Sequence, residues 1–273
     1  MSERRHIEER LALFDELSGI LGAMRSFALV ALHRNRQHEA AQQEAVNTLE
    51  TILHPLLAFL PPQAAKGEDL WLLLGSSRGF CGNFNESLLA YWQASGGQSC
   101  PTIALGERLV ARMPATARWI PVANASGHTE ISSTTDRILL AIRDLQTRYG
   151  PASGLVACLH DTGGLRTRRL LPFPGTGATA EAVPILTNEP AAQVAAGVAE
   201  QYLYHQLLWL QLKSLGMENH LRLQQMENAL QHLNETGTAL QRQRNRMRQE
   251  DIIEEIELMA RVNANARKPS WSH

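Results

Sequence analysis

Lysine is scarce in this sequence of 273 residues, which contains only Lys66, Lys213 and Lys268 beside 23 arginines. Basic and acidic residues nearly cancel, 26 against 27, so the net charge is -1 and the pI is about 6.8. Proteins that bind duplex nucleic acid usually carry a basic excess, so nucleic acid is not expected as a partner. The preference for arginine over lysine is explained most simply by genomic base composition.

Cysteine is also rare. Cys81, Cys100 and Cys158 form an odd, widely spaced set, which predicts reduced thiols in a cytoplasmic protein rather than a disulfide framework. Their spacing, with the histidines of the chain, fits no zinc-ligand pattern. We therefore expect no metal and no other cofactor.

Long hydrophobic runs are missing. No stretch of about 18 uncharged apolar residues occurs, so no segment is expected to span a membrane directly. Residues 1–10 carry acids where a signal peptide needs an apolar run. The hydrophobic fraction of 44% nevertheless permits a packed core and excludes a wholly disordered chain. The sequence predicts a soluble protein, which can still belong to an assembly at a membrane.

Residues 1–60 are predicted to form the N-terminal helix of a coiled coil. Apolar residues recur there three or four positions apart, as one face of a helix requires; they are Ile7, Leu11, Phe14, Leu17, Leu21, Met24, Ala28 and Ala31. The pattern stops near Pro55 and Pro61, because proline cannot continue a helix without losing backbone hydrogen bonds.

Residues 191–266 contain no proline and are predicted to form a matching C-terminal helix. An alternating three-and-four spacing, typical of a coiled-coil seam, is formed by Leu223, Met226, Leu230, Leu233, Gly237, Leu240, Arg244 and Met247. The apolar positions then shift to Ile252, Ile253, Ile256 and Met259. Such a helix would be on the order of 110 Å long. We therefore expect antiparallel pairing with the N-terminal helix, and the remainder either exposed or buried by other subunits.

Residues 66–190 have the pattern of an inserted, Rossmann-like α/β domain. Short apolar runs predict strands at Asp69–Gly75, Pro101–Gly106, Ala117–Val122 and Gly154–His160. An amphipathic run predicts a helix at Thr134–Tyr149. An antiparallel edge strand is expected at Arg168–Phe173. The predicted fold class is thus α/β: a long antiparallel coiled coil of terminal helices with a mostly parallel sheet inserted between them.

The segment Gly75–Asn85 is the best place to look for chemistry, because a phosphate-binding loop would follow a strand in this way. It lacks both GxxxxGK[ST] and GxGxxG. An anion site made of backbone N–H groups remains an alternative to a purely structural turn. Cys81, in the same loop, would be a candidate nucleophile if a histidine lay beside it in space.

In its order of elements the chain resembles the γ subunit of F-type ATP synthases. Three segments carry the resemblance. The first is Ile20–Ala28, which contains Met24. The second is the block Arg78-Gly-Phe-Cys81-Gly-Asn-Phe-Asn85, which is similar to the family's SDRGLCGxxN, and the third is Glu218–Ala229, which contains Arg222 and Met226 and is followed by Arg248–Ile256. The sequence departs from the family where Ser77 replaces Asp, Ile253 replaces Thr, Leu258 replaces Glu and Val262 replaces Gly. These departures favour a divergent, alternative branch that translocates H+ or Na+.

The resemblance implies a rotor shaft that is not an enzyme by itself and binds no nucleotide. The implied partners are a hexamer of α and β subunits, an ε subunit and the membrane c-ring. The implied location is peripheral, on the cytoplasmic face of the bacterial inner membrane. Residues implied at partner interfaces are Met24, Arg78, Cys81, Arg222, Met226, Arg248, Ile252, Glu255, Ile256 and Met259.

Two other readings of the sequence remain open. The chain could be a small cytoplasmic α/β enzyme with helical dimerisation arms that works through the Cys81 loop, or a coiled-coil scaffold. The enzyme reading predicts that Cys81→Ser abolishes an activity of the isolated protein, whereas the shaft reading predicts little effect.

Overall fold

A computed structural model describes residues 2–61, 67–174 and 188–266. The chain forms two compact units, residues 27–225 and residues 1–26 with 226–273. Helices α1 (Ser2–Leu53) and α5 (Ala191–Ala266) each run through both units. The division into segments 1–60, 66–190 and 191–266 stays a prediction.

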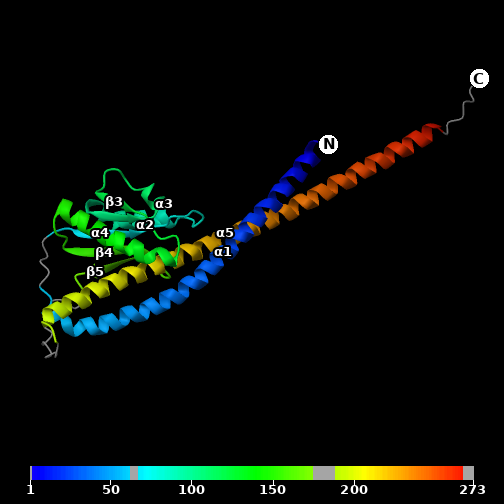
Figure 1. Ribbon diagram of the computed structural model, residues 1–273. Coiled ribbons are helices and arrows are strands. Elements are labelled where there is room, and N and C mark those ends of the chain that lie inside the picture. Colours follow the sequence, from blue (N-terminus) through cyan, green and yellow to red (C-terminus); the bar gives the residue numbers. More distant parts are fainter. Residues whose placement is uncertain (1, 62–66, 175–187, 267–273) are drawn as a thin grey trace, which may run out of the picture. The chain divides into compact units, whose positions relative to one another are not determined.

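A five-stranded sheet forms the centre of the 27–225 unit (Figure 1). Its strands are β1 (Asp69–Leu74), β2 (Thr102–Leu105), β3 (Trp119–Val122), β4 (Gly154–Asp161) and β5 (Gly164–Leu171). The spatial order is β3-β2-β1-β4-β5, in which only β5 is antiparallel to its neighbour. The predicted α/β class with a mostly parallel sheet is confirmed.

Short helices connect the strands. They are α2 (Phe84–Ala94), α3 (Glu107–Val110) and α4 (Ile131–Tyr149), with 3-10 turns η1 (His54–Phe59), η2 (Gly97–Ser99) and η3 (His128–Glu130). The predicted edge strand Arg168–Phe173 is antiparallel as expected, but it starts earlier, at Gly164. Gly164 has φ +107, which lets the chain reverse tightly after β4 and begin pairing at once.

Both faces of the sheet are buried. On one face Leu72 of β1 packs in the same core as Ile138 of α4 and Leu207 of α5, all 0% exposed. On the other, Leu73 shares a core with Trp92 of α2. Because alternate residues of a strand face opposite sides, a sheet covered on both faces requires a continuous apolar run. This requirement explains the Leu-Trp-Leu-Leu-Leu sequence of β1.

Helices α1 and α5 are antiparallel in each unit. In the 27–225 unit, Asn35 Nδ2 donates to the Leu212 carbonyl at 2.7 Å, and Gln42 Nε2 donates to the His205 carbonyl at 3.1 Å. In the other unit, Arg4 lies 3.5 Å from Asp251. The residue numbers increase along α1 while those of their partners on α5 decrease, as in the antiparallel pairing that the sequence predicts.

The predicted seam on α5 is its more buried face. Met226 and Leu240 are buried, and the other predicted seam positions are half-buried. From Arg248 to Arg261 every residue is exposed. Among the described residues, no helix combines the length and apolar character needed to cross a bilayer.

Candidate functional site

The carboxyl ends of β1 and β4 are where an open α/β sheet of this order would bind a ligand, because the strand order switches between them. Here helix α5 occupies this position. Ser214 Oγ donates to the Leu74 carbonyl at the end of β1, at 3.1 Å. Lys213 Nζ lies 3.0 Å from Asp161 Oδ1 at the end of β4. The place of a bound nucleotide is thus taken by the chain's own helix.

The ion pair at the end of β4 is electrostatically favourable. Burial by itself raises the pKa of Asp161, but hydrogen bonds from Lys213 and from the Thr162 backbone N–H outweigh it and leave that pKa below its usual value. Asp161 is therefore ionised at neutral pH and holds Lys213 against the sheet. The pair joins α5 to β4 and leaves no free base at this position.

The Ser76–Gly82 loop, which follows β1, is closed by its own hydrogen bonds. Asn85 Oδ1 accepts from the Ser76 backbone N–H at 3.0 Å, and Asn85 Nδ2 donates to Ser76 Oγ at 2.8 Å. Ser76 Oγ in turn donates to the Arg78 carbonyl at 3.1 Å. Because Asn85 already uses the Ser76 N–H, that group is not available to an anion, which favours the structural turn over the phosphate-site alternative.

Phe80 stands out in this loop. It is the only non-glycine residue among those described with a positive φ, 60°, and its side chain is 63% exposed. A left-handed backbone is unfavourable for a bulky residue and persists only where its surroundings enforce it. The loop therefore holds an aromatic ring out to solvent in a conformation that the isolated segment would avoid.

Cys81 does not have the surroundings of a nucleophile. The residue is buried, and its Sγ lies 3.4 Å from Ser76 Oγ and 3.7 Å from the Arg78 carbonyl. His160, the nearby imidazole, bonds through Nε2 to the Phe84 carbonyl at 2.8 Å. Burial lowers the pKa of His160. Within the described residues no imidazole is hydrogen-bonded to the Cys81 thiol, so the pair that thiol activation requires is not formed.

Arg222 on α5 ties the loop to the helix. Its Nε donates to the Gly79 carbonyl at 3.1 Å, its Nη1 donates to Asn219 Oδ1 at 2.6 Å, and its Nη2 donates to Glu218 Oε1. Glu218 and Arg222 are 3% and 6% exposed. Burial raises the pKa of the Glu218 carboxyl, and the Arg222 and Arg78 charges oppose that rise. The loop and α5 thus share a buried, charged contact.

The structure brings together the predicted residues Arg78, Cys81 and Arg222, in and beside this loop. Sequence reasoning missed Glu218 and Asn219 as members of the cluster. The signal that could have found Glu218 is its i,i+4 spacing from Arg222 on a helix. That spacing does not show burial, since most such pairs lie on exposed helix faces.

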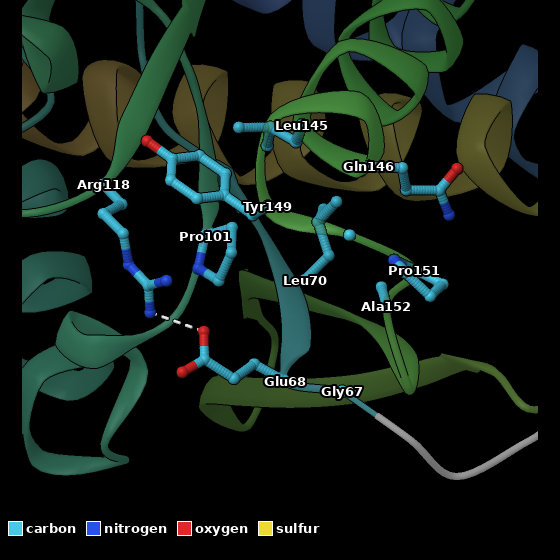
Figure 2. A pocket seen from close by; sticks show the side chains of 11 residues that line it. Gly67, Glu68, Leu70, Pro101, Arg118, Leu145, Gln146, Tyr149, Pro151 and Ala152 are labelled. Carbon is cyan, nitrogen blue, oxygen red and sulfur yellow. Dashed lines mark hydrogen bonds and ion pairs between the residues drawn. The ribbon is translucent and has the colours of Figure 1, made fainter.

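A cavity of about 260 Å³ lies at the opposite end of the sheet, by the carboxyl end of α4 (Figure 2). Arg118 and Glu68 form an ion pair of 2.5 Å at its wall, and the Arg118 guanidinium lies 5.2 Å from the centre of the Tyr149 ring. Each charged group in the wall is engaged with the other. The cavity wall has no cysteine, serine, threonine or histidine, and its one carboxylate, Glu68, is paired with Arg118.

A second hollow, of about 310 Å³, lies between α1, α5 and the β4–β5 turn. Its charged wall residues are Arg36, Glu39 and Lys213, and His220 also lines it. Burial raises the pKa of Glu39, while Lys213 lowers it. The charges are mixed in sign, and no cluster of metal ligands occurs anywhere in the described parts of the chain. This hollow therefore has no evident ligand.

The remaining predicted interface residues lie in the other unit. Met24 of α1 is half-buried and Met226 of α5 is buried, on the faces that the two helices turn toward each other. Arg248, Ile252, Glu255, Ile256 and Met259 are all exposed, and the two isoleucines and the methionine are 46%, 60% and 62% exposed. A partner contact for these residues stays a prediction. Val262 lies beyond the residues whose side chains the structure describes.

Known proteins resemble the chain along most of its length. The family model described as ATP synthase matches residues 3–260. The ATP synthase gamma chain of Chlorobaculum tepidum is 24% identical over an alignment of 246 residues, and the match covers 79% of this chain and 79% of that protein.

Solved structures agree in fold. The rotor of the Euglena gracilis mitochondrial ATP synthase in rotational state 1 gives a TM-score of 0.68 at 14% identity, over 92% of this chain and 99% of that one. The OSCP/F1/c-ring structure from the same organism, in rotational state 3, gives 0.63 at 15% identity over 99% of both. The predicted combination of long terminal helices and an α/β domain is the fold that these rotor structures share.

Proposed function

From the premise that this chain belongs to the ATP synthase family, whose model matches residues 3–260, we propose that it is the central-stalk, or rotor-shaft, subunit of an F-type ATP synthase. It couples ATP synthesis or hydrolysis in a hexamer of α and β subunits to transport of protons or sodium ions through the membrane sector. The match over nearly the whole chain carries the proposal, because it includes both terminal helices and the α/β domain.

The geometry supports a subunit without catalysis of its own. The crevice where an α/β sheet would bind a nucleotide contains Ser214 and Lys213 of α5, bonded to the ends of β1 and β4. Cys81 has no imidazole partner among the described residues. A sheet used in this way positions a helix rather than a substrate.

The exposed end of α5 supports a surrounding partner. Ile252, Ile253, Ile256, Leu258 and Met259 expose between 46% and 64% of their surface. A group of large apolar side chains exposed together indicates a protein contact rather than a free surface. In the proposed assembly this segment lies inside the α/β hexamer, and the asymmetry of the shaft gives each catalytic site different contacts, which shifts its nucleotide affinity.

The other proposed partners are an ε subunit and the c-ring, which the α/β domain would contact. The similar solved structures are a rotor and an OSCP/F1/c-ring assembly, and these support the placement. The proposed location is the cytoplasmic face of a bacterial inner membrane, peripheral and within the complex. The departures at Ile253 and Leu258 support assignment to a divergent branch of the family.

Co-expression with the α and β subunits and the membrane-sector subunits of the same organism tests the proposal. We expect the chain to co-purify with α and β, and the complex in vesicles to pump ions when ATP is added. A chain that co-purifies with neither subunit would refute the proposal. Truncation after Arg248 sharpens the test: it removes only exposed residues among those described, so assembly should persist at least in part while ATP-driven pumping falls. Unchanged pumping would contradict the proposed position of the α5 end.

Cys81→Ser separates the shaft from the enzyme alternative. Because the Cys81 thiol is hydrogen-bonded to Ser76 Oγ and the Arg78 carbonyl, a serine hydroxyl should preserve the loop and leave ATP hydrolysis and pumping by the complex nearly unchanged. Loss of an activity measured on the isolated variant chain would favour the enzyme instead.

A further inference from the structure

Three residues spaced four apart on α5 bind the end of β1 and the loop that follows it. Ser214 donates to the Leu74 carbonyl, Glu218 accepts the Arg78 backbone N–H, and Arg222 donates to the Gly79 carbonyl. Residues at i, i+4 and i+8 form one stripe on a helix. A stripe bonded to three backbone sites, at Leu74, Arg78 and Gly79, fixes how α5 is rotated about its own axis with respect to β1 and the loop.

Stability alone does not account for the choice of residues. Removing a carboxylate and a guanidinium from water is costly, and well-packed apolar side chains often stabilise a core as much or more. What Glu218 and Arg222 add is direction, because Arg222 binds Glu218, Asn219 and the Gly79 carbonyl through three different nitrogens. The bonds to Glu218 and Asn219 lie within α5 and hold the guanidinium in place, and the bond to the Gly79 carbonyl reaches the loop.

The loop that is held in this way carries Phe80, exposed and at positive φ. A strained, solvent-facing aromatic residue would relax if the loop were free. The bonds of Arg222 to the Gly79 carbonyl and of Glu218 to the Arg78 N–H lie directly before Phe80 in the chain. They are therefore placed to maintain its conformation.

We propose that Glu218 and Arg222 are positioning residues that lock the Ser76–Gly82 loop to α5, so that the loop and the shaft helix turn as one body. This inference rests on the proposed rotor function and deepens it. A loop that could slip against the helix would take up rotation as local motion instead of transmitting it between the α/β domain and α5.

Hydrogen exchange on the purified full-length chain tests the lock directly. Arg222→Lys keeps a positive charge but replaces the planar guanidinium and its three nitrogens by a single ammonium nitrogen, and Glu218→Gln removes the charge with little change of shape. In both variants amide exchange in residues 76–82 should rise about tenfold, the effect of losing one charged hydrogen bond. The exposed Glu200→Gln and Arg143→Lys are matched controls and should leave exchange in the loop unchanged. Loop exchange within about twofold of the wild type in both cluster variants would overturn the proposal.

The ratio of ions pumped to ATP hydrolysed in the assembled complex distinguishes transmission from simple folding. A merely structural defect lowers assembly and reduces hydrolysis and pumping together. The lock predicts that the variant complexes hydrolyse ATP while pumping per ATP falls at least about threefold, with Arg222→Lys less affected than Arg222→Met. Looser loops with an unchanged ratio would overturn the proposal. If the wild-type chain itself fails to assemble, the rotor function is refuted and the coupling role with it. If the wild-type complex couples pumping to ATP hydrolysis and the variant complexes do so equally well, only the lock is refuted.

Discussion

Alanine substitution of Ile252, Ile253 and Ile256 separates the stability of the isolated chain from its affinity for a surrounding hexamer. These side chains are 46%, 55% and 60% exposed, so each still has about half of its surface available to a partner. Burying a whole isoleucine contributes about 1.5–3 kcal/mol, and the half that remains exposed therefore contributes about 1 kcal/mol. The triple substitution should remove about 3 kcal/mol of association free energy, or about two orders of magnitude in Kd.

The isolated chain should not be destabilised by the same change. Alanine has a higher helix propensity than isoleucine, and the three side chains contribute little buried surface to the fold. The melting temperature should stay the same or rise slightly. Ile138→Ala is the contrasting control, because Ile138 is 0% exposed within the core beneath the sheet. It should cost about 2–5 kcal/mol and lower the melting temperature by several degrees.

The assay pairs thermal unfolding of each chain with its binding to purified hexamer of α and β subunits. Ile52→Ala is the matched control for affinity, since Ile52 is also 46% exposed but belongs to the 27–225 unit. It should bind like the wild type. A triple variant that melts several degrees lower would show that these residues pack within the chain. One that binds as tightly as the wild type would show that the α5 end is not an interface.

Two further predictions concern the helix pair and the sheet. At Gly237 a Cβ would lie 3.9 Å from Phe14 Cδ2, an ordinary contact, so Gly237→Ala should stabilise the chain by about 0.5–1 kcal/mol in chemical denaturation. Gly216→Ala should destabilise the chain, because the added Cβ would lie 2.9 Å from Asn35 Nδ2, which donates a hydrogen bond to the Leu212 carbonyl. Equal stabilisation by both substitutions would refute this packing. Hydrogen bonds from Arg169 hold the pKa of Asp69 below its usual value, so Asp69→Asn should cost about 0.5–1 kcal/mol at pH 7. The wild-type advantage should shrink as pH falls through the lowered pKa, below which Asp69 is protonated in both folded and unfolded chains. An advantage that does not decrease as the pH is lowered would contradict the ion pair.

The surroundings of Gly237 show what the spacing of a coiled-coil seam leaves open. A glycine in a seam permits a close approach of the two helices, yet the space at this position would accept alanine. The close approach is instead at Gly216, outside the predicted seam. Seam spacing identifies which residues face a partner helix, but the distance between the helices depends on side chains from the other helix, such as Asn35, which the local pattern does not contain.

The resemblance identified some residues of the loop cluster before the structure did. Arg78, Cys81 and Arg222 belong to the quoted motifs and lie in or beside the loop. Glu218 occurs in the same motif, but its 3% exposure and its bond to the loop could not be read from sequence. The motif groups these residues in the sequence, but only the tertiary structure shows that Glu218 is a buried carboxylate.

The sequence by itself determined the elements. The spacing of apolar residues and the absence of proline from 191–266 specify α5, and the short apolar runs specify β1, β2 and β4 as strands buried on both faces. Helix and strand periodicity are local properties, written in neighbouring residues. The tertiary structure alone decided that α5 fills the crevice of the sheet, where Ser214 meets the Leu74 carbonyl 140 residues away in the chain. Contacts across such a separation depend on the packing of the whole unit, so no local sequence pattern predicts them.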